Sequence, residues 1–213
     1  MNLGWDQADR DALDLLRPLL DAGGYLPWTD GALRPAALVA VCNEIALAGR
    51  RELVELGSGV STIVLARLAR ELGGRLTSLE HDPDWAHVVR SQLEREGISD
   101  SARLIEAPLE PHSAALDDAP WYAARAVAKL PEDIDLLLVD GPPGYGEGMA
   151  LSRYPALPAL EDRLALNAMA VLDDAHREGE RTILERWTSD CEGWTFAVDE
   201  ALGIARCIKP QPG

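Results

Sequence analysis

The chain has 213 residues, of which 47% are hydrophobic and 26% are charged. It contains no run of about eighteen apolar residues, which a membrane span would need. Its formal net charge is −16 at pH 7, so its surface should repel nucleic-acid phosphates and anionic membranes. These figures favour one globular domain that acts on neither nucleic acid nor membrane.

The N-terminus and the cysteines predict a cytoplasmic protein. The first ten residues have no apolar stretch behind a basic start, so no secretory signal is expected. Cys42, Cys191 and Cys207 are odd in number and far apart in the sequence. That pattern is typical of buried reduced thiols and not of a disulfide framework.

Two amphipathic helices are predicted first, at about residues 9–20 and 35–48. The segment 23–28 joins them, and it either folds over the functional site or forms an ordinary packed connection. Five apolar segments then alternate with helical patterns, which predicts a mostly parallel sheet covered by helices on both faces.

The expected strands are 52–56, 75–79, 103–105, 134–139 and 166–172, and the expected helices are 61–72, 83–96, 121–129, 154–164 and 179–191. Two further β-rich segments, 194–198 and 204–208, flank a turn with Gly203 and predict a terminal hairpin. Such an ending favours an antiparallel strand at the edge of the sheet.

A glycine turn, Gly57-Ser58-Gly59, connects the first apolar strand to a helix. Glycines let a ligand approach the backbone, and the start of a helix offers free N–H groups to a carboxylate or phosphate. Glu80 ends the second strand about twenty residues later, where an acid can accept hydrogen bonds from both ribose hydroxyls. Together these features predict an adenosine-containing cofactor, whereas each alone fits an ordinary turn or a solvated strand end.

With these residues the sequence resembles the class I S-adenosylmethionine-dependent methyltransferases over about residues 51–209. Glu55 to Gly59 match the first motif of that family, Glu80 its ribose-binding acid, and Asp140 the acid that ends its fourth strand. The resemblance implies a Rossmann-like α/β fold, with a seven-stranded, mostly parallel sheet and an antiparallel last strand. We therefore expect a cofactor-binding domain at 51–213, and from the two preceding helices an N-terminal helical segment at 1–50 that covers the site, in one compact unit.

The resemblance also implies which residues bind S-adenosylmethionine. They are Gly57, Ser58, Gly59 and Ser61 at the methionine end, Glu80 at the ribose, His81 and Ala107 near adenine, and Glu55 and Asp140 as further contacts. An NAD-dependent oxidoreductase is the main alternative, because such enzymes place a glycine turn and an acid at the same positions. Thr62 stands where their third glycine would be, which favours methyl transfer.

Acidic residues follow two neighbouring strands of the predicted sheet. Asp140 ends one strand, and Asp173 and Asp174 follow the next, so the three carboxylates should meet at one edge. They would repel one another unless a cation or several donors neutralised them, and Mg²⁺ or another divalent cation would do so. Otherwise Asp140 only contacts the cofactor or backbone, and the other two only cap a turn.

The acidic set is similar to that of the catechol and caffeoyl-coenzyme A O-methyltransferase families, which implies a metal site at Asp140, Asp173 and Asp174. Asp174 stands in place of an amide of those families, and the run 141–144 replaces the segment with their catalytic lysine. Asp140 and His176 are therefore the predicted catalytic residues, with His176 as general base because imidazole titrates near neutral pH. His176 otherwise caps a helix or lies at the surface, and His112 is a weaker candidate.

The run Val139 to Tyr145 also resembles, locally, the matching turn of plant glucuronoxylan O-methyltransferases. This favours a small hydroxylated or carboxylated acceptor or a saccharide. Five aromatic residues either frame the acceptor or only pack: Trp28, Trp121, Tyr122, Tyr145 and Tyr154. A cofactor-binding partner protein without transferase activity is a further alternative. The oligomeric state, with a homodimer as one alternative, cannot be read from the sequence.

Overall fold

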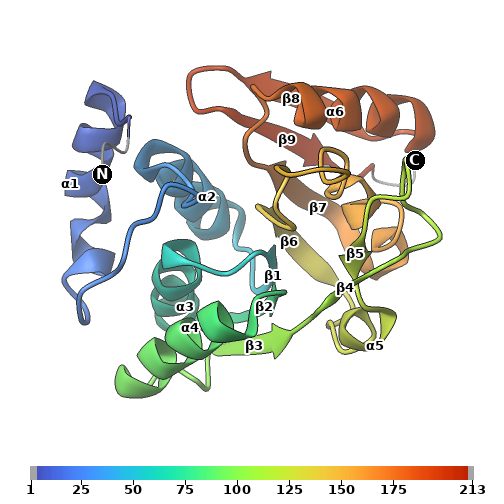
Figure 1. Cartoon of the computed structure of the whole chain (residues 1–213). Coiled ribbons are helices and arrows are strands. Elements are labelled where there is room, and N and C mark those ends of the chain that lie inside the picture. The colour runs from blue at the N-terminus through green and yellow to red at the C-terminus, as the bar shows by residue number, and fades with distance from the viewer. Residues whose placement is uncertain (1–3, 211–213) are drawn as a thin grey trace.

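One mixed sheet forms the centre of the protein in the computed structural model, which describes residues 4–210 (Figure 1). Its strands are β1 (Glu52–Leu56), β2 (Arg75–Glu80), β3 (Ala102–Glu106), β6 (Ile134–Val139), β7 (Leu164–Leu172), β8 (Thr195–Asp199) and β9 (Ile204–Ile208). The order is β3-β2-β1-β6-β7-β9-β8, and β9 runs antiparallel to both of its neighbours. The predicted Rossmann-like fold with an antiparallel last strand is confirmed.

The terminal hairpin enters the sheet differently from the sequence prediction in one respect. β9 pairs with β7 on one side and with β8 on the other, so β8 is the edge strand. The antiparallel strand therefore lies inside the edge and not at it. A hairpin connection requires β8 and β9 to be antiparallel to each other, but it does not decide which of them docks on the sheet.

Helices cover both faces of the sheet (Figure 1). They are α1 (Gln7–Leu20), α2 (Pro35–Ala48), α3 (Val60–Leu72), α4 (Pro83–Arg95), α5 (Ala124–Val127) and α6 (Glu178–Asp190). On β6, Leu136 and Leu138 belong to the core under α1 to α4, whereas Leu137 and Val139 belong to the core on the face of α5 and α6. Successive side chains of a strand point to opposite faces, so an almost continuous apolar strand supplies two cores.

Two predicted helices are wrong. At 121–129, Trp121–Tyr122 form the short strand β5, which pairs with β4 (Leu109–Glu110), and only α5 is helical. At 154–164 there are two 3₁₀ turns, η1 (Tyr154–Ala156) and η2 (Glu161–Arg163), before β7 begins at Leu164. The second error has a physical reason, because Pro155 and Pro158 lack the N–H groups that an α-helix would use.

The two N-terminal helices are tied to each other by an ion pair between Arg34 and the buried carboxylate of Asp9. The carboxylate of Asp9, whose side chain is fully buried, accepts hydrogen bonds from Arg34 Nη2 at 2.7 Å and from the Ala36 N–H at 3.2 Å. This pair ties the first turn of α1 to the start of α2. Residues 1–3 of the predicted N-terminal segment and 211–213 of the predicted domain lie outside the described part of the chain.

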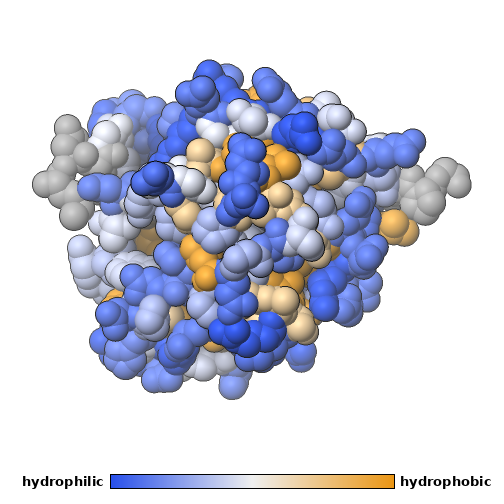
Figure 2. Space-filling model, turned by 45° about the vertical axis from the view of Figure 1, so that its right-hand side comes forward, coloured by the Kyte–Doolittle hydropathy of each residue, from blue (hydrophilic) through white to orange (hydrophobic). Residues whose placement is uncertain are grey.

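The surface is mostly hydrophilic and the cysteines are buried. Figure 2 shows a face covered mostly by hydrophilic side chains, with hydrophobic ones visible between them. Cys42, Cys191 and Cys207 are buried and unpaired, as predicted. Within residues 4–210, no helix combines the length and apolar character needed to cross a membrane.

Candidate functional site

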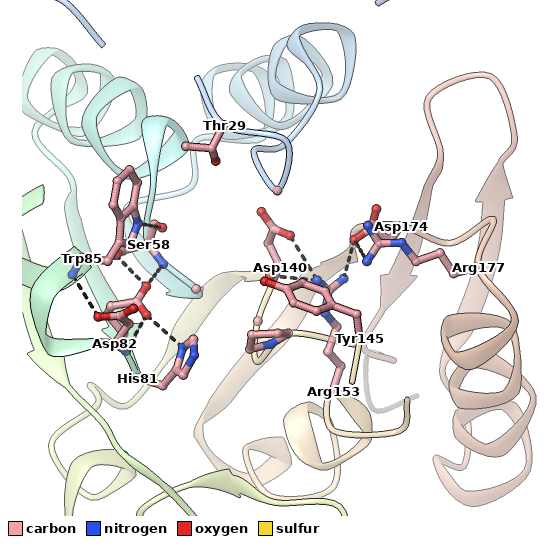
Figure 3. A pocket seen from close by; sticks show the side chains of 15 residues that line it. Thr29, Ser58, His81, Asp82, Trp85, Asp140, Tyr145, Arg153, Asp174 and Arg177 are labelled. Carbon is pink, nitrogen blue, oxygen red and sulfur yellow. Dashed lines mark hydrogen bonds and ion pairs between the residues drawn. The ribbon is translucent and has the colours of Figure 1, made fainter. Parts of the chain in front are cut away.

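A cleft lies at the carboxyl ends of the parallel strands, where the strand order reverses between β1 and β6 (Figure 3). Ligands of open α/β sheets bind at such reversal points. Ser58 and His81 line one side of the cleft, and Asp140 and Arg153 line the other. Thr29, from the joint between α1 and α2, also lines it, so the N-terminal segment forms part of the site.

Two glycines form the floor of this cleft. Gly57 has a φ of +89°, which is in the left-handed region that favours glycine, and a Cβ there would lie 3.0 Å from the backbone oxygen of Asp140. A Cβ on Gly141 would lie 2.8 Å from the Gly57 Cα. The ends of β1 and β6 therefore approach each other as only glycine permits, and a ligand can reach their backbones.

A tyrosine lies against the same floor. A Cβ on Gly141 would be 2.5 Å from the hydroxyl of Tyr122, which is buried and has no hydrogen-bond partner within residues 4–210. Burial holds the pKa of Tyr122 well above its ordinary value, so the phenol stays protonated. Tyr145, which lines the cleft, is 72% exposed. The sequence analysis groups both tyrosines with the other aromatic candidates and cannot tell the buried one from the exposed one.

Glu80 lines the cleft at the end of β2, and protein donors already surround its carboxylate. It accepts hydrogen bonds from the Ser58 N–H and Oγ at 2.9 and 2.8 Å, and from the Asp82 N–H and His81 Nδ1 at 2.9 Å each. Burial opposes ionisation, but the hydrogen bonds outweigh it and lower the pKa of Glu80. Two of these four donors are side-chain groups, Ser58 Oγ and His81 Nδ1, and the other two are backbone N–H groups.

Glu55 lies beneath the glycine turn and is fully buried. Its carboxyl accepts hydrogen bonds from the hydroxyls of Ser61 at 2.6 Å, Thr62 at 2.5 Å and Ser78 at 2.7 Å. Burial raises the pKa of Glu55 to about 7, against the effect of these donors. The group joins β1, β2 and the start of α3, so it supports the turn from below.

The structure separates the predicted cofactor residues into two sets. Those that line the cleft are Gly57, Ser58, Glu80, His81 and Asp140. Glu55, Ser61, Gly59 and Ala107 are not in its lining: the first two are buried together, Gly59 borders a separate apolar pocket, and the Ala107 N–H donates to the Glu80 backbone oxygen at 2.7 Å. The role of each residue in cofactor binding stays a prediction.

The three aspartates do meet at one edge of the cleft, as the sequence predicts. A carboxylate oxygen from each of Asp140, Asp173 and Asp174 lies within 4.8 Å of the others. Burial, followed by the neighbouring Asp173, raises the pKa of Asp140 well above its ordinary value. Burial and then Asp174 raise the pKa of Asp173 to about 6. The cluster therefore holds more negative charge than its surroundings neutralise easily.

Arg153, which the sequence analysis misses, supplies a positive charge to this cluster. Its side chain is 4% exposed, with Nη2 at 3.3 Å from Asp140 Oδ1 and Nη1 at 3.1 Å from Asp174 Oδ2. Arg177 Nη1 contacts the same oxygen of Asp174 at 2.7 Å. Arg153 directly precedes η1 and belongs to no recognised motif, so only its place in the fold reveals it.

These contacts test the predicted metal site. Carboxylate oxygens are the donors that Mg²⁺ prefers. Asp140 and Asp174, however, already form ion pairs with the Arg153 guanidinium, and a metal bound to them would lie against that like charge. The residues therefore do not fit a divalent cation while Arg153 holds this position.

The predicted bases lie away from the cleft. His176 is exposed and lines a neighbouring polar cavity together with Asp173 and Asp174. His112 packs edge-on against Trp121, with ring centroids 4.9 Å apart, and is not among the residues that line the cleft. The catalytic role of His176 stays a prediction.

Comparisons with known sequences agree with the cleft. Residues 54–175 match a family described as "Methyltransferase domain". The chain is 32% identical over 117 residues to a Halobacterium salinarum protein named "Probable cobalt-precorrin-6B C(15)-methyltransferase (decarboxylating)". That match covers 54% of this chain and 51% of the relative, so the chain spans about half the length of the curated relative that it matches.

Solved structures share the fold. The SAH-bound methyltransferase PaMTH1 of Podospora anserina has a TM-score of 0.65 at 14% identity, over 98% of this chain and 89% of that one. The O-methyltransferase from Bacillus cereus in complex with SAH has a TM-score of 0.61 at 17% identity, over 96% of this chain and 91% of that one. At such low identities, the likeness is one of fold alone.

Proposed function

This chain belongs to the methyltransferase-domain family, and from that membership we propose that it transfers a methyl group from S-adenosylmethionine to an oxygen of a small molecule. The acceptor is a hydroxylated or carboxylated compound or a saccharide. One observation carries the proposal: the bare floor of Gly57 and Gly141 lies beside two acids, Glu80 and Asp140, at the strand reversal.

The residues of the cleft fit an adenosyl sulfonium ligand. Gly57, Ser58 and Gly141 line the cleft, so a ligand bound there can lie against their backbone. Glu80 would bind the ribose, and Asp140 would bind the positively charged methionine end. The bound donor supplies a methyl group that is activated for transfer by the positive charge on its sulfur.

Two observations support an oxygen acceptor. The cleft wall opposite Glu80 is polar and charged, with Asp140, Asp174 and Arg177, which suits an acceptor that forms hydrogen bonds. The Bacillus cereus structure of similar fold is named as an O-methyltransferase. The Halobacterium salinarum relative is named for methylation at a carbon, so a carbon acceptor is the alternative that the experiment must separate.

The residues around the acceptor would act by positioning and by proton removal. Thr29 and Tyr145 lie on the cleft wall, where they would help to exclude water from a bound acceptor. Asp140 and Asp173 lie close together and both have raised pKa values, so each carboxylate is a stronger base than an ordinary aspartate. We assign the acceptor's proton to this pair. His176 is the alternative base that the sequence predicts.

The predicted divalent cation has no step in this proposal, because Arg153 is already paired with two of the three acids that would bind it. A metal at Asp140, Asp173 and Asp174 stays a prediction of the sequence. Without a metal, the rate enhancement would depend mainly on how the cleft positions donor and acceptor.

The test is calorimetric titration with S-adenosylhomocysteine, followed by incubation with methyl-labelled S-adenosylmethionine and matched acceptor panels. The panels contain phenols, carboxylic acids and saccharides on one side, and amines and carbon acids on the other. Mass spectrometry of the products should find methyl ethers or esters.

Each outcome separates one alternative. Failure to bind S-adenosylhomocysteine would remove the proposed function, and preferential binding of NAD would indicate an oxidoreductase. Methylation of amines or carbon acids alone would overturn the oxygen acceptor. Tight binding with no product from any panel would favour a cofactor-binding partner protein without transferase activity.

A further inference from the structure

We propose that Arg153 is the resident cation of the acidic cluster and takes the place that the sequence assigns to a divalent metal. Methyl transfer by this protein is then independent of metal. The inference rests on the proposed function for its catalytic meaning, but its geometry and its binding test stand apart from that function.

All five N–H donors of the guanidinium have acceptors in the protein. Nε donates to the Pro142 oxygen at 3.1 Å, Nη1 to the Asp173 oxygen at 3.2 Å and to Asp174 Oδ2 at 3.1 Å. Nη2 donates to the backbone oxygen of Asp140 at 2.9 Å and to its Oδ1 at 3.3 Å. An arginine offers five donors in a rigid planar arrangement, and here each one is used.

Three of these acceptors are backbone oxygens, those of Asp140, Pro142 and Asp173. Backbone oxygens at strand ends have fixed positions, and they would attract the guanidinium whatever the aspartate side chains bind. Arg153 therefore does not lie among the acids only because their charges attract it. It connects the segments that follow β6 and β7, so its position is part of the fold.

The charges around Arg153 explain why such a cation is needed. Asp140, Asp173, Asp174 and the buried Glu180 contribute four carboxyl groups, and Glu180 Oε1 lies 3.4 Å from Arg153 Nη1. Arg153 pairs with Asp140 and Asp174, and Arg177 pairs with Asp174, so two positive charges lie against the four carboxyl groups. A divalent cation on these carboxylates would lie against a guanidinium that the backbone oxygens of Asp140, Pro142 and Asp173 hold in place.

Arg153 is a positioning residue in this arrangement. It pairs with Asp140 and Asp174, which line the cleft and follow β6 and β7. The same guanidinium therefore fixes both carboxylates relative to each other. Lysine would keep the charge but could not make five bonds in one plane. Methionine would keep much of the length and remove the charge.

The test measures binding of Mn²⁺ by electron paramagnetic resonance, with Mn²⁺ alone as the probe. The proteins are the full chain, Arg153→Met, Arg153→Lys, Asp173→Asn, the double variant Arg153→Met/Asp173→Asn, and Arg163→Met as a control for the loss of an arginine elsewhere. Arg163 pairs with Glu132 on the surface, away from the cleft. Because carboxylate sites for hard cations work at micromolar to millimolar concentration, titration to about 1 mM is sufficient.

The full chain and Arg163→Met should leave Mn²⁺ free, and a chelator should not change turnover. Arg153→Met should immobilise Mn²⁺, with at least about tenfold higher affinity than the full chain, because the cluster has lost a unit of positive charge. The double variant should lose that binding. If the role of Arg153 were only structural, its removal would not create a metal site.

Immobilised Mn²⁺ in the full chain, lost on Asp173→Asn, would overturn the inference. A folded Arg153→Met that leaves Mn²⁺ free would also overturn it, since the guanidinium would then occupy no cation site. Should Arg153→Met fail to fold, Arg153→Lys decides, with reduced kcat and free Mn²⁺ expected and immobilised Mn²⁺ contradicting the inference. Binding of S-adenosylhomocysteine, measured on the same samples, reports on the proposed function independently.

Discussion

Gly57 and Gly141 face each other at the carboxyl ends of β1 and β6, so closely that a Cβ on Gly141 would lie 2.8 Å from the Gly57 Cα and 2.9 Å from its nitrogen. No side chain fits between these backbones. The strand reversal thus ends in bare peptide groups, with the acids Glu80 and Asp140 on either side. Four predictions follow from this cleft and its supports.

Gly141→Ala should reduce both stability and cofactor binding. The new methyl group would meet the backbone of Gly57 and the Tyr122 hydroxyl, neither of which is a flexible chain end. Overpacking of this kind costs about 1–3 kcal/mol. We expect a fall of that size in the free energy of unfolding, measured by urea denaturation, and about tenfold weaker binding of S-adenosylhomocysteine by calorimetry.

Gly59→Ala is the matched control for Gly141→Ala. Gly59 has an extended backbone with φ −177°, and nothing lies within 4 Å of a Cβ built there. Its stability should change by less than about 0.5 kcal/mol. Equal destabilisation by the two alanines would show that the close approach of β1 and β6 is not the cause.

Glu80→Gln should weaken binding of S-adenosylhomocysteine by about tenfold to a hundredfold, because a hydrogen bond to a charged group is worth about 1.5–3 kcal/mol. Calorimetry at pH 7 measures this change. Glu106→Gln is the control, since Glu106 is the register partner of Glu80 on β3 and its side chain is 51% exposed. Similar losses in both variants would point to general electrostatics and not to a ribose contact.

Stability should fall as pH rises through the range in which Glu55 titrates. Burial raises its pKa from 4.5 to about 7, so the folded protein keeps a proton that the unfolded chain releases. Stability from this group is then full below pH 4.5 and is lost as pH rises to about 7, by on the order of 3 kcal/mol. Urea denaturation from pH 5 to 8 should show this slope.

Glu55→Gln should flatten that slope, because an amide does not titrate in this range. Asp173, with a pKa of about 6, contributes a smaller slope of the same sign, so Asp173→Asn should flatten the profile less. An unchanged slope in Glu55→Gln would mean that the buried carboxyl ionises at its ordinary pKa.

Asp140→Asn should lower kcat by about a hundredfold, since general acid–base residues contribute about 10²–10⁴ to a rate. The amide keeps an oxygen for Arg153 Nη2, so folding should be preserved. His176→Asn should change kcat by less than about threefold, because the imidazole is exposed and lies outside the cleft lining. The reverse order of effects, measured by single-turnover kinetics, would make His176 the base.

The bounds of several strands could be predicted from the local sequence pattern. The predicted ranges 52–56, 134–139 and 204–208 coincide with β1, β6 and β9. An apolar run bounded by charged or turn residues is a local feature, so its limits can be read in the sequence. At 121–129 and 154–164 the local pattern misled, because the pairing of β5 with β4 and the two prolines overrode helical spacing.

The acids at the site were also predictable, because topology alone brings the ends of parallel strands to one edge. Their neutralising partner was not. Arg153 lies 13 residues after Asp140 and 20 before Asp173, in a proline-rich turn without helical or strand periodicity. For Glu55 and Ser61, the resemblance implied contacts with the cofactor. In the structure, the Ser61 hydroxyl donates a hydrogen bond to the Glu55 carboxyl.

By itself, the sequence determined the strands of the central sheet, its two covered faces and the positions of the carboxylates at the strand ends, because these depend on residues close together in the chain. Only the tertiary structure decided which glycines meet, which carboxyl is buried and which cation lies among the acids. Those contacts join residues far apart in the chain, and their distances follow from how the layers pack.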